Sequence, residues 1–136
     1  MAQLSRSKVT LRIMGDSLDP DKITDRLGCE PTQKNSKGDV RVMPKSGREV
    51  VQKSGMWRLQ ARECEPEKID AQVSEILGQL SSDLDVWQEL ASSYDIDLFC
   101  GLFMEQGNEG LEISPSTLQA LGERGILLGL DIYDPS

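Results

Sequence analysis

IDLFCGLFM, residues 96–104, is the stretch of sequence that decides the fold. Its even-numbered positions are all apolar, and its other face carries Phe99, Gly101 and Phe103. An apolar residue at every second position is typical of a β-strand with one buried face. We therefore predict a strand here that lies in a sheet, with helices packed on its apolar side.

Three other stretches alternate in the same way and predict further strands. They are residues 8–14 (KVTLRIM), 56–62 and 126–133. In the last of them the pattern places Ile126, Leu128, Leu130 and Ile132 inside. Trp57 and Trp87 lie in the apolar phase of their segments, which predicts core packing for both.

Helix signals stand between the predicted strands. Asp19 and Ser114 are each followed by proline, which is typical of a helix N-cap and first helical position. We expect Leu118 and Leu121 of the later helix to face inward. Pro66 opens a longer apolar stripe, which predicts two helices or one helix kinked near Ser81.

These elements together predict an α+β fold. We expect a two-layer sandwich with an antiparallel or mixed sheet and helices on one face, ferredoxin-like or related. The 136 residues fit a single domain, 1–136. Residues 1–7 are expected to be flexible, and residues 31–55 to be loop-rich with short strands near Val40–Met43 and Val50–Gln52.

The composition argues against several partners. The formal net charge is −8, which disfavours nucleic acid and anionic membrane surfaces. No apolar run has the length of a transmembrane segment or a signal peptide, so we expect a cytoplasmic protein. Cys29, Cys64 and Cys100 form no C-x-x-C pair, and we expect reduced thiols and no metal site.

The chain contains no histidine, which excludes His-dependent nucleophile activation and imidazole metal ligands. No phosphate-binding loop or calcium loop is present in the required form. We therefore assign no catalytic, cofactor-binding or metal-binding residue, and we do not expect an enzyme. A pair of carboxylates is defined in space and not along the sequence, so a carboxylate-dependent hydrolase remains a further alternative.

The most informative predicted surface is the sheet face turned away from the helices. Arginines beside aromatic side chains are typical of protein or anionic-ligand interfaces. A solvated face with cross-strand Arg–Asp pairs is the plainer interpretation, and a homodimer through Phe99, Phe103 and Leu127 is a third. The candidate interaction face consists of Arg12, Arg58, Arg62, Phe99, Phe103, Leu127, Asp131 and Tyr133, with Thr10 and Gln60 among them.

Several short motifs follow one another along the chain. They are GDSLDPDKIT (15–24), Leu27-Gly28, Pro31-Thr32, KGD (37–39), SGMWRL (54–59), CGLF (100–103), NEG (108–110) and LDIY (130–133). In this order they resemble the bacterial domain of unknown function 4279 family, over about residues 8–133. The resemblance implies a stand-alone bacterial domain in the cytosol and brings no known activity or catalytic residues.

The leading functional hypothesis is a non-enzymatic protein-interaction module of the immunity or inhibitor type, which covers a basic surface on an unidentified protein partner. The acidic balance and the missing catalytic chemistry favour it. The alternative is a sensor of a small anionic metabolite, bound by the arginines of the candidate face or by the glycine-containing loops.

Overall fold

The computed structural model describes residues 2–135 and is built around a five-stranded mixed sheet. Its strands are β2 (Arg6–Gly15), β3 (Gln33–Asn35), β6 (Gly55–Gln60), β7 (Asp95–Phe103) and β9 (Leu127–Tyr133). Their order across the sheet is β3-β6-β2-β7-β9. Neighbouring strands run antiparallel except β7 and β9, which are parallel.

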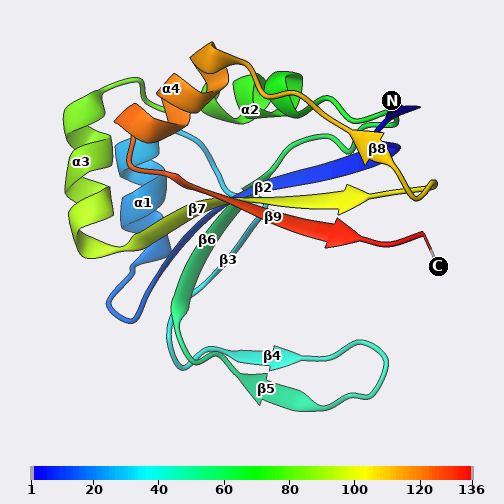
Figure 1. Cartoon of the computed structure of the whole chain (residues 1–136). Helices are drawn as coiled ribbons and strands as arrows, with labels where there is room; N and C mark the ends of the chain where they lie inside the picture. Colours follow the sequence, from blue (N-terminus) through cyan, green and yellow to red (C-terminus); the bar gives the residue numbers. More distant parts are fainter. Residues whose placement is uncertain (1, 136) are drawn as a thin grey trace.

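The helices pack on one side of this sheet (Figure 1). They are α1 (Pro20–Leu27), α2 (Ile69–Leu77), α3 (Leu84–Ser93) and α4 (Pro115–Glu123). This arrangement confirms the α+β class predicted from the sequence. Over residues 2–135 the structure has no helix with the length and apolar character needed to cross a bilayer.

The core lies between the sheet and the helices. The alternation in β2, β6 and β7 is confirmed, because their inward side chains are buried together with both tryptophans. Trp57 and Trp87 have no exposed surface, and each indole N–H is bonded, to Thr24 Oγ1 at 3.1 Å and to Ser81 O at 2.7 Å. A buried indole usually has such a partner, so both rings are fixed in place.

Two predictions of inward-facing residues are wrong. Leu118 is 49% exposed, because α4 turns Thr117 and Leu121 toward the core instead. Ile132 and Leu130 lie opposite buried residues of β7 and therefore share the helix-facing side. They are nevertheless exposed, because β9 is an edge strand that extends beyond the helices covering β7 (Figure 1).

Local chemistry explains the helix ends. Asp19 accepts a hydrogen bond from the Asp21 N–H, and Ser114 from the Thr117 N–H, as N-cap residues do. Helix α2 begins at Ile69 and not at Pro66, which corrects the predicted start. The reason is that the Glu67 N–H donates to Leu4 O at 3.1 Å, which ties the preceding residues to the N-terminal segment.

Residues 2–7 take part in the fold, and Met1 lies outside the residues that the structure describes. Although the sequence predicts flexibility for residues 1–7, β1 (Ala2–Gln3) pairs with β8 (Glu109–Gly110). Leu4 and Ser7 are buried, and the Ser7 Oγ donates to Gln72 Oε1 at 2.6 Å. Residues 2–7 therefore join the sheet to α2.

Between β3 and β6 the chain makes an excursion that we name the arm, residues 36–54. Its strands β4 (Val40–Val42) and β5 (Glu49–Val51) pair antiparallel, as the sequence predicts for this region. Figure 1 shows the arm extending away from the helices, beyond the opposite side of the sheet. It carries five basic and two acidic residues in a chain whose net charge is −8.

Candidate functional site

The open face is the side of the sheet turned away from the helices. Strand register sets its rows of side chains, because side chains on directly paired positions share a face. One row contains Arg58, Arg12 and Asp97, and the next contains Gln60, Thr10 and Phe99. A hollow of about 290 Å³ lies over these rows. Its lining consists of Lys8, Thr10, Arg12, Arg58, Gln60, Phe99, Gly101, Phe103 and Tyr133.

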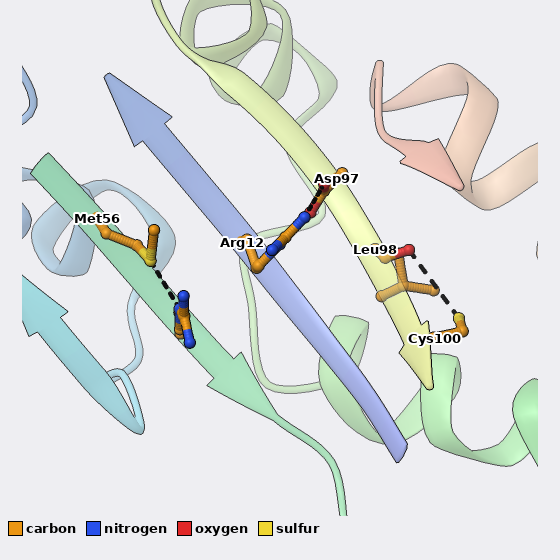
Figure 2. Close-up of polar contacts among 6 residues, drawn as sticks. Arg12, Met56, Asp97, Leu98 and Cys100 are labelled. Atoms are coloured by element: carbon orange, nitrogen blue, oxygen red, sulfur yellow. Dashed lines mark hydrogen bonds and ion pairs between the residues drawn. The ribbon is translucent and has the colours of Figure 1, made fainter. Parts of the chain in front are cut away.

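Arg12 is fixed by a bidentate ion pair with Asp97. Its Nε donates to Asp97 Oδ1 at 2.8 Å and its Nη2 to Oδ2 at 2.6 Å, across the strands β2 and β7 (Figure 2). The hydrogen bonds from this pair raise the pKa of Arg12, and burial opposes them only in part. The guanidinium also lies over the Phe99 ring, 4.5 Å from its centroid. Arg12 therefore has its charge neutralised and its position set.

Arg58, beside it in the same row, has no such partner. Within residues 2–135 no carboxylate forms an ion pair with it. Its Nε donates to Met56 Sδ at 2.6 Å, the bond drawn from Met56 in Figure 2, and a thioether is a weak, neutral acceptor. Burial lowers the pKa of Arg58, the charges of Arg12 and Arg41 lower it further, and the charge of Asp97 opposes the shift only in part. A half-buried positive charge thus faces the hollow without a counter-ion.

Aromatic rings form the other end of the hollow. Phe103 stacks on Tyr133 with centroids 4.6 Å apart and an interplanar angle of 4°. On the neighbouring strand the Arg6 guanidinium lies 4.0 Å from the Phe103 centroid. A hydrogen bond to Asp131 raises the pKa of Tyr133, with the charge of that carboxylate acting in the same direction. Phe103 is therefore covered from both neighbouring strands.

The predicted face is brought together in part. Arg12, Arg58, Phe99, Phe103 and Tyr133 all line the hollow. The other three predicted residues lie outside it. Arg62 is exposed beyond the end of β6, Leu127 is 69% exposed on the edge strand, and Asp131 lies against the Tyr133 hydroxyl.

The sequence reasoning missed three residues of this region. Lys8 and Asp97 follow the same alternation as Arg12 and Phe99, so the period of two was sufficient to find them. Asp97 is the carboxylate of the Arg–Asp pair that the plainer interpretation anticipates. Arg41 acts on Arg58 from the arm, and no pattern in the sequence indicates how close the arm lies to β6.

Other potential sites carry less chemistry. Over residues 2–135 no group of three or more His, Cys, Asp or Glu side chains could hold a metal ion. Asp25 and Glu89 line one hollow near α1 and α3, but Glu89 is bound to Arg26. Of the two glycine-containing loops, the one at 37–39 forms a turn in which the Ser36 N–H donates to Asp39 Oδ2 at 2.7 Å. In the other glycine-containing loop, residues 106–110, Glu109 accepts hydrogen bonds from Ser5 and from the Glu105 N–H.

Comparison with known proteins adds one result. Residues 5–135 match the family model described as Domain of unknown function (DUF4279). No curated protein and no solved structure matches the chain. The match spans nearly the whole sequence and includes every strand and helix that positions the hollow. The chain therefore belongs to the DUF4279 family.

Proposed function

We propose that the protein is a small binding module of the cytoplasm whose open face takes an anionic group of its ligand. The observation that carries this proposal is Arg58, a half-buried guanidinium that faces a hollow without a carboxylate partner among residues 2–135. A buried charge is costly unless it is paired, so a ligand anion would relieve an unfavourable arrangement of the free protein. Three thiols without disulfide partners support the reducing compartment.

The chemistry of the lining favours binding over catalysis. General acid–base catalysis needs a group whose pKa lies near the working pH. Arginine keeps its proton in proteins, and Asp131 holds the pKa of Tyr133 above its usual value. The lining contains no Asp, Glu, Cys or His. The arginines and Tyr133 therefore keep one charge state near neutral pH, which suits recognition of an anion.

The charge of the face also bears on the choice between the two leading hypotheses. The acidic composition favours a module that covers a basic partner. The lining of the hollow, however, contains Lys8, Arg12 and Arg58 and no carboxylate, and Asp97 beside it is already paired with Arg12. Locally the sign is positive, and this favours the anionic ligand. Binding of a basic protein partner stays a prediction, and it would involve the acidic surface outside the hollow.

A panel of anionic metabolites at millimolar concentration, measured by thermal unfolding, tests the proposal. Binding to the folded state stabilises it by about 2.7 kcal/mol at a ligand concentration of 100 Kd. We expect one ligand class to raise the Tm of the wild type and to lose that effect in Arg58→Gln. The control is Arg62→Gln, which removes the same charge from outside the hollow. Equal Tm shifts in both variants would place the binding elsewhere, and no shift across the panel would reject it.

A second candidate function, self-association, rests on the free edge of β9. Among residues 2–135 this strand pairs with β7 alone, so its outer backbone groups have no strand partner in the described part of the sheet. Leu127 and Ile132 are 69% and 59% exposed there. An exposed apolar edge is a template for another strand, and two copies of β9 can pair across a two-fold axis. Native mass spectrometry should then show a dimer that Ile132→Lys dissociates, whereas a monomeric wild type would exclude this interface.

A further inference from the structure

We propose that the anionic group taken by the open face is the phosphate monoester of a small molecule, held between Arg58 of the sheet and Arg41 of the arm. The inference rests on the proposed function and specifies its ligand. It depends on where the arm lies, on the charges that remain unpaired, and on the size of the space beside them.

The arm brings a second arginine to the border of the hollow. Arg41, on β4, lines an adjacent hollow of about 410 Å³ together with Gln33. Gln33 lies directly opposite Arg58 in the ladder between β3 and β6. A lining residue of one hollow is thus paired directly with a lining residue of the other, which places the two hollows next to each other across β3 and β6.

Neither guanidinium has an ion-pair partner of its own, although the charge of Asp97, which is bonded to Arg12, acts on Arg58 from a distance. Like Arg58, Arg41 forms no ion pair with a carboxylate within residues 2–135. The charge of Arg41 contributes to lowering the pKa of Arg58, so the two groups are near enough to repel each other. Asp39 also lines the second hollow and accepts a hydrogen bond from the Ser36 N–H through Oδ2, but it forms no ion pair with Arg41 within residues 2–135. Two mutually repelling cations are thus left for the ligand to neutralise.

A phosphate monoester matches this pair better than a carboxylate does. It carries a charge of about −1.5 to −2 at pH 7 and three acceptor oxygens, whereas a carboxylate carries one charge on two oxygens. The guanidinium fork binds phosphate through two parallel N–H···O bonds, so two arginines can share one phosphate. A dianion bound between Arg58 and Arg41 neutralises both charges, whereas a monoanion leaves one net positive charge.

The remaining space indicates a small, partly apolar body for the ligand. The open-face hollow of about 290 Å³ is near the lower limit for small-molecule sites. Phe99 and Phe103 line it next to the arginines, and the Gly101 position contributes no side chain to its floor. A ring or short carbon skeleton attached to the phosphate can lie there.

Titration with phenyl phosphate and with benzoate, at low ionic strength, tests the inference. Both ligands carry an aromatic ring, but only phenyl phosphate is a dianion at pH 7. We expect phenyl phosphate to bind the wild type at least fivefold more tightly than benzoate. The NMR chemical shifts of the Nε–H groups of Arg58 and Arg41 should both change when phenyl phosphate is added. This measurement uses the wild-type protein and needs no variant.

The protonation of the ligand provides a second readout. The second phosphate pKa is about 6, so the dianion fraction rises about fourfold from pH 5.5 to pH 7.0, and the affinity should rise by the same factor. Because the chain has no histidine, no side chain of ordinary pKa titrates in this range. The affinity for benzoate should stay constant over the same interval.

Matched variants locate the second arginine. Arg41→Gln should weaken phenyl phosphate about fivefold, as expected for one lost charge near an exposed anion, and leave benzoate unchanged. Arg48→Gln removes the same charge from the arm outside both hollows and should change neither affinity. Arg41 is exposed, so its replacement spares the core.

Failure of this inference differs from failure of the proposed function. Equal affinities for benzoate and phenyl phosphate, or equal effects of Arg41→Gln and Arg48→Gln, would overturn the phosphate assignment while anion binding at Arg58 stands. A phosphoserine peptide that binds more tightly than phenyl phosphate would overturn the small-molecule source. If neither anion binds at 10 mM or so, the proposed function itself is rejected along with the inference.

Discussion

Replacement of Asp97 by asparagine should make the protein less stable and at the same time increase its affinity for anions. The bonds from Arg12 to Asp97 are 2.8 and 2.6 Å long, and the two side chains are only 25% and 13% exposed. Hydrogen bonds to charged groups contribute about 1.5–3 kcal/mol each. Asparagine keeps one acceptor oxygen and loses the charge, so we expect a loss of about 1–2 kcal/mol in the free energy of unfolding.

The gain in affinity follows from the same substitution. Without Asp97 the positive charge of Arg12 is no longer neutralised, and it acts on an anion bound beside Arg58. One additional charge at about 4 Å is worth about 1 kcal/mol in water, which corresponds to about a fivefold gain in affinity. Few surface substitutions lower stability and raise affinity together, and this combination is therefore diagnostic for the open face.

Urea unfolding followed by tryptophan fluorescence measures the first effect, because Trp57 and Trp87 are both fully buried. NMR titration with phenyl phosphate measures the second. The control is Asp95→Asn, on the same strand, where an exposed carboxylate has no ion pair within the described residues, and it should change stability by less than about 0.5 kcal/mol. If Asp97→Asn is no less stable than this control, the ion pair contributes nothing. If its affinity for the anion is unchanged, the anion does not bind beside Arg12.

Three further predictions concern the rest of the fold. Burial raises the pKa of Cys100 to about 12. A thiol reagent at pH 8 should therefore modify the other two cysteines in the native protein, and Cys100 only after unfolding. Rapid reaction of all three cysteines in the native protein would contradict this prediction. Gln72 is 1% exposed, and both ends of its side-chain amide are hydrogen-bonded to Ser7. Gln72→Leu should therefore lower the free energy of unfolding, measured in urea, by about 1–3 kcal/mol. An unchanged free energy of unfolding would mean that the hydrogen bonds between Gln72 and Ser7 add no stability. Burial would raise the pKa of Glu109, but hydrogen bonds from Ser5 and from backbone N–H groups outweigh it and lower that pKa. The stabilisation by Glu109 is then present at pH values above the pKa of the unfolded chain, about 4.3, and it is lost as the pH falls through the lowered pKa of the folded protein. Wild type and Glu109→Gln should therefore differ in urea midpoint at pH 7 and converge near pH 2. A difference that stays constant with pH would contradict the lowered pKa.

The sequence predicts the strands β2 and β7 and the ends of α1 well, because the residues that form them act through local physical effects. Alternation in β2 and β7 specifies which side chains are buried, because a pleated strand turns successive residues to opposite faces. Asp19 and Gly28 mark the ends of α1, since one caps the first N–H groups and the other adopts a φ of +82°. Such signals are local and need no knowledge of the remaining structure.

The errors arise where burial depends on distant partners. Ile132 and Leu130 are in the predicted phase, but the extent to which α4 covers β9 is a property of helix packing and not of the strand pattern. Arg62 has the correct residue type, but it lies two residues beyond the end of β6, where its N–H donates to Glu75 of α2 at 2.8 Å. Arg41 is the extreme case, because its place beside Arg58 depends on how the arm leaves the sheet.

The arm leaves the sheet and returns to it at adjacent positions, since Asn35 and Met56 are directly paired. Closing such a loop costs only about 0.6 kcal/mol more for each doubling of its length. Residues 36–54 can thus be lengthened, shortened or exchanged for another sequence while the core stays intact. Because Arg58 lies on the sheet and Arg41 on the arm, a graft between Asn35 and Gly55 would replace one side of the proposed site and leave the other side in place.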